Sequence, residues 1–427
     1  MPNKTILFLG AGFSAPAEIP MQRRIIDEML KPAFSDILHI EPESRKFLYS
    51  FIDVGIFLLK MFNAKEVVSI ERMMGIIDYL SHLKNIILDT KNQDKQTIML
   101  EKVSNSFFGE SVQEAFIENL IGVSENKDFT TLLDLRKYQL LVELKEFVRS
   151  TIATLKIKAD LEDIFTIFDK SLMEQENWGE YTYSDLDRVR HSLLRLFTYY
   201  FGKKIKMFKN YNTYKSFIEF CKKDVTIITT NWDSIVEKLF NKSKLNYNVF
   251  SGKNFEDKIG ISIIKLHGSI NWFHCNACGE LEITNEASIA EYLFKDEEPA
   301  RCSKCNISEP HNKIYLRPEI ITPTMFKTLD SYLYRSIWKK ASDALSSANR
   351  IIFVGYSLPV ADFEIRYLLK KCIKFDTKID VVLQNTDRPQ KTTYNLSAEC
   401  RYSTTLSAHS PVFCYDGFAD FFNKEKK

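Results

Sequence analysis

Short apolar runs that end abruptly in small or polar residues constrain the fold of this 427-residue chain most strongly. The runs cover residues 5–10, 225–231, 261–269, 350–357 and 379–385. Uninterrupted apolar runs of this length are typical of parallel strands that are buried on both faces of a sheet. The sequence therefore predicts an α/β fold with a Rossmann-like, doubly wound parallel sheet. A ligand of such a sheet would sit at the carboxyl ends of the strands.

A long helical segment separates the first two runs. Apolar residues recur at three-and-four spacing in residues 69–89, 160–173 and 185–201, and the last of these helices is expected to start from a cap at Asp185. We therefore predict a large helical insertion. The expected domains are a helical insertion domain at 26–223 and a ligand-binding domain formed by 1–25 together with 224–427.

Charge and hydropathy argue against nucleic acid and a membrane as direct partners, although local basic patches remain compatible with the sequence. The 58 basic and 56 acidic residues give a net charge of +2, which provides no electrostatic reason to expect direct binding of nucleic acid or an anionic membrane. The amino terminus runs directly into a glycine turn instead of a cleavage site, and no window approaches the ~18 to 20 apolar residues that span a bilayer. We therefore expect a cytoplasmic protein.

Four cysteines form two CxxC pairs in the second interruption of the sheet, at about residues 271–316. They are Cys275, Cys278, Cys302 and Cys305. In a cytoplasmic chain this spacing favours metal over disulfides, and four thiolates complete the tetrahedral shell of a zinc ribbon. Because a closed four-cysteine site has no open coordination position, the zinc would be structural. The adjacent His274 is interpreted as a bystander.

The first apolar run ends in a glycine turn that opens a helical stretch. The residues concerned are Gly10, Ala11, Gly12 and Ser14. Missing side chains would let the backbone approach a phosphate, with the N–H groups of the turn facing its charge. The alternative is a tight β–α turn that uses glycine for steric reasons alone.

Polar residues follow two further runs. Asn231 and Asp233 come after the second run, where an amide can hold a ribose hydroxyl or a water and a carboxylate can stabilise positive charge. Their alternative role is to cap the helix that follows. His267 lies at the end of the 261–269 run and precedes a glycine, so its imidazole could act as a general base at the same edge.

In their order along the chain, these motifs resemble the sirtuin family over about residues 1–25 and 224–388. Sirtuins begin with Gly-Ala-Gly-x-Ser followed by Gly-Ile-Pro-Asp-Phe-Arg. The matching residues here are Gly10, Ala11, Gly12, Ser14, Ile19, Pro20 and Arg23, and the departures are Glu18, Met21 and Gln22. The family's Gln-Asn-Ile-Asp matches Asn231 and Asp233 but not the glutamine, because Thr230 stands there.

The resemblance assigns roles to individual residues. It places the catalytic histidine of the family on His267 and implies that Asn231 orients the ribose and the water while Asp233 offsets positive charge. It implies that NAD is held by the glycine turn and by residues near its phosphates and adenine-side ribose, namely Gly355, Ser357 and Asn385. Arg23 would lie beside the phosphates or the pocket loop.

Sirtuins cleave the bond between nicotinamide and ribose in NAD, and the acceptor decides the activity. Acetyl-lysine would make the protein a deacylase, and water would make it an NAD hydrolase. Met21 and Gln22 replace the family's Asp-Phe pair, and no acetyl-lysine groove is recognisable in residues 321–329. The large helical insertion resembles that of the sirtuin-like effectors of bacterial anti-phage defence, which hydrolyse NAD.

NAD hydrolysis by such an effector is therefore the leading prediction. The four-cysteine ribbon points instead towards an NAD-dependent deacylase, and a non-catalytic NAD or ADP-ribose sensor is a third alternative. The resemblance also implies a homo-oligomer, with a HerA-type ATPase ring as a candidate partner.

Overall fold

A computed structural model describes most of the chain outside the first part of the helical insertion. The described residues are 4–19, 161–177, 182–252, 260–285, 289–294, 300–308, 314–324, 331–360, 362–389, 394 and 397–425. The helix predicted at 69–89 lies outside them, as do Pro20, Met21, Gln22 and Arg23. Within the described ranges, no helix combines the length and the apolar character needed to cross a membrane.

The main sheet has seven parallel strands in the order β10-β9-β8-β1-β2-β4-β3. Their bounds are β1 Thr5–Leu9, β2 Val225–Thr229, β3 Tyr247–Val249, β4 Ile261–Lys265, β8 Arg350–Val354, β9 Lys378–Val382 and β10 Val412–Cys414. The five predicted runs are thus confirmed as β1, β2, β4, β8 and β9. β1 lies at the centre, where the strand order reverses, because β2 pairs on one side of it and β8 on the other.

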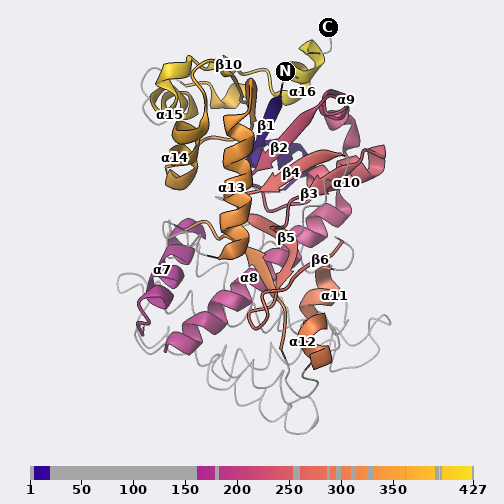
Figure 1. Cartoon of the computed structure of the whole chain (residues 1–427), viewed down its shortest axis with the longest axis vertical. Helices are drawn as coiled ribbons and strands as arrows, with labels where there is room; N and C mark the ends of the chain where they lie inside the picture. The colour runs from indigo at the N-terminus through magenta and orange to yellow at the C-terminus, as the bar shows by residue number, and fades with distance from the viewer. Residues whose placement is uncertain are drawn as a thin grey trace, which may run out of the picture.

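Helices cover both faces of this sheet (Figure 1). Alternation along β1 divides the core, because Leu7 and Leu9 join one buried cluster while Ile6 and Phe8 join another. The first cluster includes residues of α9 (Lys215–Phe220), α10 (Ile235–Ser243) and α16 (Phe418–Lys424), and the second includes residues of α13 (Tyr332–Ser346), α14 (Phe363–Cys372) and α15 (Ala398–Thr405). The predicted doubly wound α/β fold is therefore confirmed.

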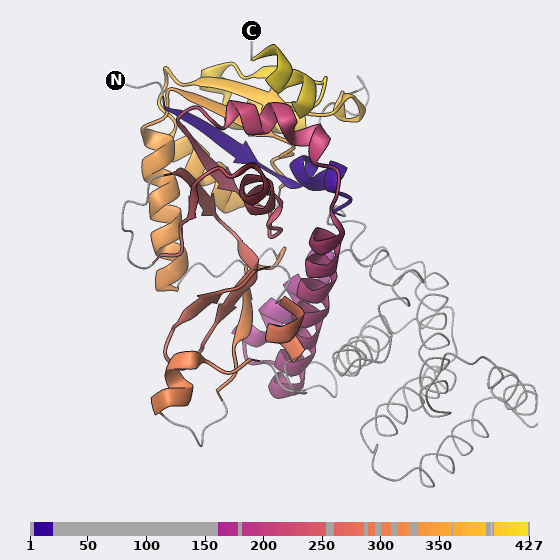
Figure 2. The same ribbon diagram turned by 90° about the vertical axis from the view of Figure 1, so that its right-hand side faces the viewer.

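A second, antiparallel sheet has the order β6-β5-β7. Its strands are β5 Gly268–His274, β6 Leu281–Ile283 and β7 Arg317–Ile320, and the short helices α11 (Ile289–Phe294) and α12 (Ser303–Ser308) lie near it. Figure 2 shows this sheet beside the long helix of the insertion and apart from the parallel sheet. The predicted run 261–269 is therefore divided, because the chain turns at Leu266 and His267 between β4 and β5.

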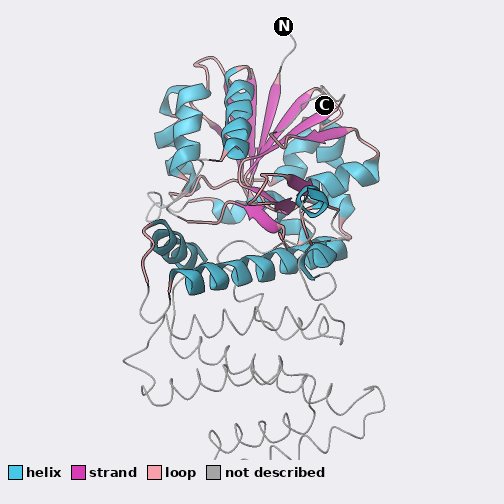
Figure 3. Ribbon diagram, turned by 60° about the horizontal axis from the view of Figure 1, so that its bottom comes forward, coloured by secondary structure: helices cyan, strands magenta, loops and turns pink. Residues whose placement is uncertain are grey.

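The described part of the insertion is helical, as predicted. It contains α7 (Leu161–Met173), α8 (Tyr183–Met207), the 3-10 helix η5 (Tyr211–Tyr214) and α9, and Figure 3 shows α7 and α8 beneath both sheets. The predicted cap at Asp185 is wrong by three residues. Thr182 caps α8 because its hydroxyl accepts from the Asp185 N–H, while the Asp185 carboxylate accepts from the Thr182 N–H.

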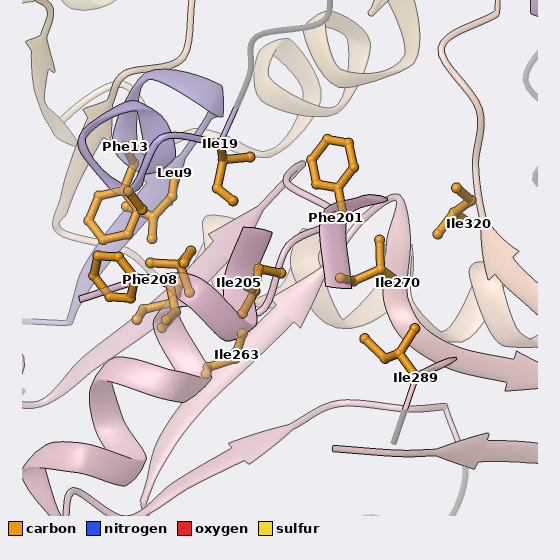
Figure 4. Packing of buried hydrophobic residues seen from close by; sticks show 14 of the residues in the cluster. Leu9, Phe13, Ile19, Phe201, Ile205, Phe208, Ile263, Ile270, Ile289 and Ile320 are labelled. Carbon is orange, nitrogen blue, oxygen red and sulfur yellow. The ribbon is translucent and has the colours of Figure 1, made fainter. Parts of the chain in front are cut away.

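One apolar cluster joins the two sheets through α8 (Figure 4). Phe201 and Ile205 of α8 belong to the same buried cluster as Ile263 of the parallel sheet and Ile270 of the antiparallel sheet. Burial of such side chains stabilises each by roughly 1.5–3 kcal/mol relative to exposure. α8 is therefore part of the core that the two sheets share.

Candidate active site

The parallel register aligns the carboxyl ends of the central strands. Leu9 of β1 pairs with Thr229 of β2 and with Val354 of β8, and Thr229 pairs in turn with Lys265 of β4. The segments that carry the predicted site residues leave the sheet from these positions and from Val382 of β9, which pairs with Val354. The sheet thus brings the glycine turn, the Asn231–Asp233 segment and the turn at His267 to one edge.

Close backbone contact explains the glycines of the first turn. The Gly10 N–H donates to the Val354 carbonyl at 3.0 Å and the Gly12 N–H donates to the Gly355 carbonyl at 2.8 Å. A Cβ on Gly12 would lie 2.8 Å from the Gly355 Cα, and Gly355 itself has a φ of +61°. The turn after β1 and the turn after β8 therefore need glycine to pack backbone against backbone. This contact supports the alternative that the glycines are needed for steric reasons. Phosphate binding by the turn stays a prediction.

Asn231 connects two of these segments. Its side-chain amide donates to the Gly10 carbonyl at 2.9 Å and to the Ser14 Oγ at 3.1 Å. Its own N–H donates to the Thr229 hydroxyl at 3.0 Å, which fixes the backbone at the end of β2. Because both amide hydrogens are used within the protein, the group that Asn231 can offer a ligand is its carbonyl oxygen.

Asp233 lies beneath this contact and is 6% exposed. Its Oδ1 accepts from the Ile235 N–H at 3.1 Å, so the carboxylate helps to cap the start of α10, although the N-cap position itself is occupied by Ser234. Burial raises the pKa of the Asp233 carboxyl, while the nearby Lys265 ammonium and a hydrogen bond from Ser14 oppose that rise. Capping and an electrostatic role are therefore compatible, because one oxygen serves the helix and the group stays next to Ser14 and Asn231.

His267 lies in the turn between β4 and β5 and is 6% exposed. Its carbonyl accepts from the Ile321 N–H at 2.9 Å, and the Ile321 carbonyl accepts from the Trp232 indole N–H, also at 2.9 Å. Ile321 therefore connects the histidine turn to the segment between Asn231 and Asp233. The Trp232 ring packs edge-on against Phe197 of α8, with ring centroids 5.1 Å apart.

The residues predicted near the dinucleotide phosphates and ribose lie at the same edge but are more open. Ser357 is exposed, and its carbonyl accepts from the Arg401 side chain at 3.0 Å. Asn385 is exposed at the start of the 3-10 helix η8 (Asn385–Asp387), directly after β9. Among the described residues, no hydrogen bond joins either side chain to the cluster of Ser14, Asn231 and Asp233. Arg23 lies outside the described residues.

Sequence reasoning missed three residues that hold these segments. Trp232 and Lys265 are two of them, and the third is Tyr214, whose hydroxyl donates to the Phe13 carbonyl at 2.9 Å and so fixes the helix after the glycine turn. The charge of Lys265 inside an otherwise apolar strand was a signal that could have been found. Trp232 and Tyr214 gave no such signal, because aromatic residues are common in cores.

The four cysteines gather as predicted. Their sulfur atoms all lie within 4.8 Å of one another, with 3.8 Å between the Sγ atoms of Cys275 and Cys305 and 3.6 Å between those of Cys278 and Cys302. Four sulfurs at about 2.3 Å from a tetrahedral zinc would be about 3.8 Å apart, so the cluster fits zinc. His274 pairs instead with Glu319 at 3.3 Å, which supports its interpretation as a bystander.

Comparison with known proteins supports the family. Residues 225–403 match the family model described as SIR2-like domain. The chain therefore contains a SIR2-like domain. This match includes Asn231, Asp233 and His267, and it also covers the four cysteines. The glycine turn lies before the matched residues but is joined to the SIR2-like domain by the pairing of β1 with β2 and β8.

Solved structures with some similarity are Sir2 proteins. Sir2Tm bound to a propionylated peptide is 16% identical, with 55% of this chain and 78% of that chain covered and a TM-score of 0.32. A Sir2 homolog in complex with NAD is 14% identical, with 58% and 77% covered and a TM-score of 0.33. No curated protein sequence matches this chain significantly.

Proposed function

We propose that the protein is an NAD hydrolase that cleaves the nicotinamide–ribose bond to give nicotinamide and ADP-ribose. The observation that carries this proposal is the position of Asn231, whose side-chain amide donates to the Gly10 carbonyl and to the Ser14 hydroxyl, which in turn hydrogen-bonds to the buried Asp233 carboxylate. Its carbonyl oxygen is left to orient a ribose hydroxyl or a water. His267, on the neighbouring strand end, supplies the base that the reaction needs.

Bond cleavage demands little acid catalysis. Nicotinamide leaves as a neutral base from a cationic ring, so it takes the C1′–N bonding electrons without being protonated. The site must hold the ribose, stabilise an oxocarbenium-like centre and deliver the acceptor. In the proposed step, the water oxygen bonds to C1′ and His267 takes the proton that the water loses, while the Asp233 carboxylate offsets the positive charge.

The other predicted residues would bind the dinucleotide or stabilise the fold. The glycine turn, Ser357 and Asn385 would contact the dinucleotide, and Arg23 would lie beside its phosphates or the pocket loop. The four cysteines would hold structural zinc, which orders the region next to β5. The cysteine cluster also favours a second candidate function, an NAD-dependent deacylase, because sirtuin deacylases commonly keep one.

We further propose that the protein acts as an NAD-depleting effector of anti-phage defence. A hydrolase of this kind must be kept inactive, which suggests control by assembly into a homo-oligomer or by a partner such as a HerA-type ATPase ring. The helical insertion between β1 and β2 supports this proposal by analogy. A monomer in gel filtration with high basal NAD turnover would contradict it.

One assay separates the candidate functions. The purified protein is incubated with NAD, with and without an acetyl-lysine peptide, and free nicotinamide is followed. A hydrolase releases nicotinamide from NAD alone, a deacylase requires the peptide, and a sensor binds without turnover. We expect release from NAD alone, lost in Asn231→Ala and in His267→Ala while circular dichroism stays unchanged. Full activity in both variants would refute the assignment.

A further inference from the structure

A buried ion pair lies directly beneath the candidate active site. The Lys265 Nζ donates to the Glu237 Oε1 at 2.9 Å, and the exposed fractions of the two residues are 0% and 5%. The same ammonium donates to the main-chain carbonyl of Asp233 at 2.5 Å. Both partners are therefore removed from solvent, and Lys265 bonds to two points of one segment.

The pair joins the two segments that carry the candidate catalytic groups. Lys265 is the last residue of β4 and comes two residues before His267. Glu237 lies in the first turn of α10, four residues after Asp233. The Lys265 side chain therefore crosses from the histidine segment to the segment of Asn231 and Asp233, and it fixes the second at its backbone.

Stability alone does not explain a pair in this place. The desolvation of two buried charges commonly cancels their attraction, and apolar residues of similar volume are often as stabilising or more so. Burial raises the pKa of both the Glu237 and the Asp233 carboxyls, which reflects the desolvation of these charges. What an apolar pair would not supply is a donor for the Asp233 carbonyl or a cation next to its carboxylate.

We propose that Lys265 and Glu237 are positioning residues that hold Asp233 and His267 in register across the strand ends. This inference rests on the proposed function, because the catalytic roles of Asp233 and His267 belong to it. Neither Lys265 nor Glu237 contacts substrate in this account. They act through the backbone of the Asp233 segment and through the short connection from β4 to His267.

The test uses Lys265→Met combined with Glu237→Leu in the full chain. The single Lys265→Met change leaves a buried carboxylate without its cation and is expected to unfold more easily than the double variant. The double variant removes both charges at similar volume and is expected to stay folded. A control is Arg350→Met with Asp380→Leu, which removes a 2.7 Å ion pair between β8 and β9, away from the carboxyl ends of the strands. Glu425, the second partner of Arg350, is 26% exposed and stays in contact with solvent.

Two measurements on the double variant test the positioning role, and one of them does not depend on enzymatic activity. Steady-state nicotinamide release should show a kcat lower by about 10- to 100-fold in the Lys265–Glu237 double variant, because small misplacements of catalytic groups cost this much. The KM for NAD should change little, and the control double variant should keep its kcat. Amide hydrogen exchange should become faster in residues 230–236 and 265–269 but not elsewhere in the chain.

The outcomes separate this inference from the proposed function. If the wild-type protein releases no nicotinamide, the proposed function fails, and the exchange measurement alone decides whether the pair orders the two segments. An unchanged kcat, or exchange that rises evenly over the chain, overturns the positioning role. If the double variant does not fold, Glu237→Gln replaces it. Glutamine keeps an oxygen for Lys265, so a folded Glu237→Gln variant should retain most of the wild-type kcat and the wild-type exchange of residues 230–236, and loss of either would overturn the positioning role.

Discussion

Substitution of Gly12 by alanine distinguishes a steric from a ligand-binding role for the glycine turn. The added Cβ would lie 2.8 Å from the Gly355 Cα and 2.9 Å from the Gly355 carbonyl oxygen, whereas ordinary contacts begin at 3.4 Å. Both neighbours are backbone atoms, so the turns after β1 and β8 would have to move apart by about 0.6 Å. That movement would strain the hydrogen bond from the Gly12 N–H to the Gly355 carbonyl.

The expected cost is typical of overpacking in a tight core. We expect Gly12→Ala to lower the free energy of unfolding by about 1–3 kcal/mol in the absence of any ligand. Thermal unfolding followed by circular dichroism measures this as a decrease of a few degrees in the Tm. Gly202→Ala is the matched control, because its Cβ would meet side-chain atoms of Ile289, at 3.2 Å, where Gly12 meets backbone, and because alanine favours the helix.

The Gly12→Ala variant can also refute the steric explanation. A Gly12→Ala variant with an unchanged Tm that has lost nicotinamide release would show that the turn can accommodate a side chain and that the glycine serves the ligand. Loss of both stability and activity would leave the packing explanation intact, because displaced turns also displace Asn231, which donates to the Gly10 carbonyl at 2.9 Å.

The cysteine cluster, the buried Asp233 and the hydrogen bond of Trp232 each lead to a further prediction. Cys302→Ser should abolish the zinc content measured by elemental analysis and lower the Tm, whereas Cys400→Ser, outside the cluster, should keep both. Because burial raises the pKa of Asp233, nicotinamide release should fall on the acid side at a higher pH than an exposed aspartate would give, and a pH–rate profile checks this. Trp232→Phe removes the donor to the Ile321 carbonyl, so it should lower kcat and also lower the free energy of unfolding by about 1–3 kcal/mol.

The sequence predicted the central strands because burial on both faces leaves an uninterrupted apolar run. It did not predict β3 and β10, because each has only three residues and none of them is fully buried, so neither strand leaves a long apolar run. It also extended β4 through the turn into the first two residues of β5, because Leu266 continues the apolar run beyond the end of β4. Strand direction changes there through Gly268, whose φ is +72°, and a backbone turn of this kind leaves no mark in hydrophobic periodicity.

The candidate site could be predicted only in part. Asn231, Asp233 and His267 follow strands, so the rule that parallel strand ends meet was enough to place them together. Which group each side chain bonds depends on distances between segments, and these appear only in three dimensions. The capping role of Asp233 is an example, because the same carboxyl serves both the helix and the site.

Helices α7 and α8, which precede β2 in the chain, contact a segment next to the candidate active site. Asp169 of α7 pairs with Arg190 of α8 at 2.6 Å and also accepts from the Thr322 hydroxyl at 2.9 Å. Thr322 follows Ile321, whose backbone bonds to both His267 and Trp232. A change in the angle between α7 and α8 would therefore move a segment that contacts both candidate catalytic loops. The described end of the helical insertion thus contacts the segment that bonds to both candidate catalytic loops, even though none of its side chains has a proposed role in the chemistry.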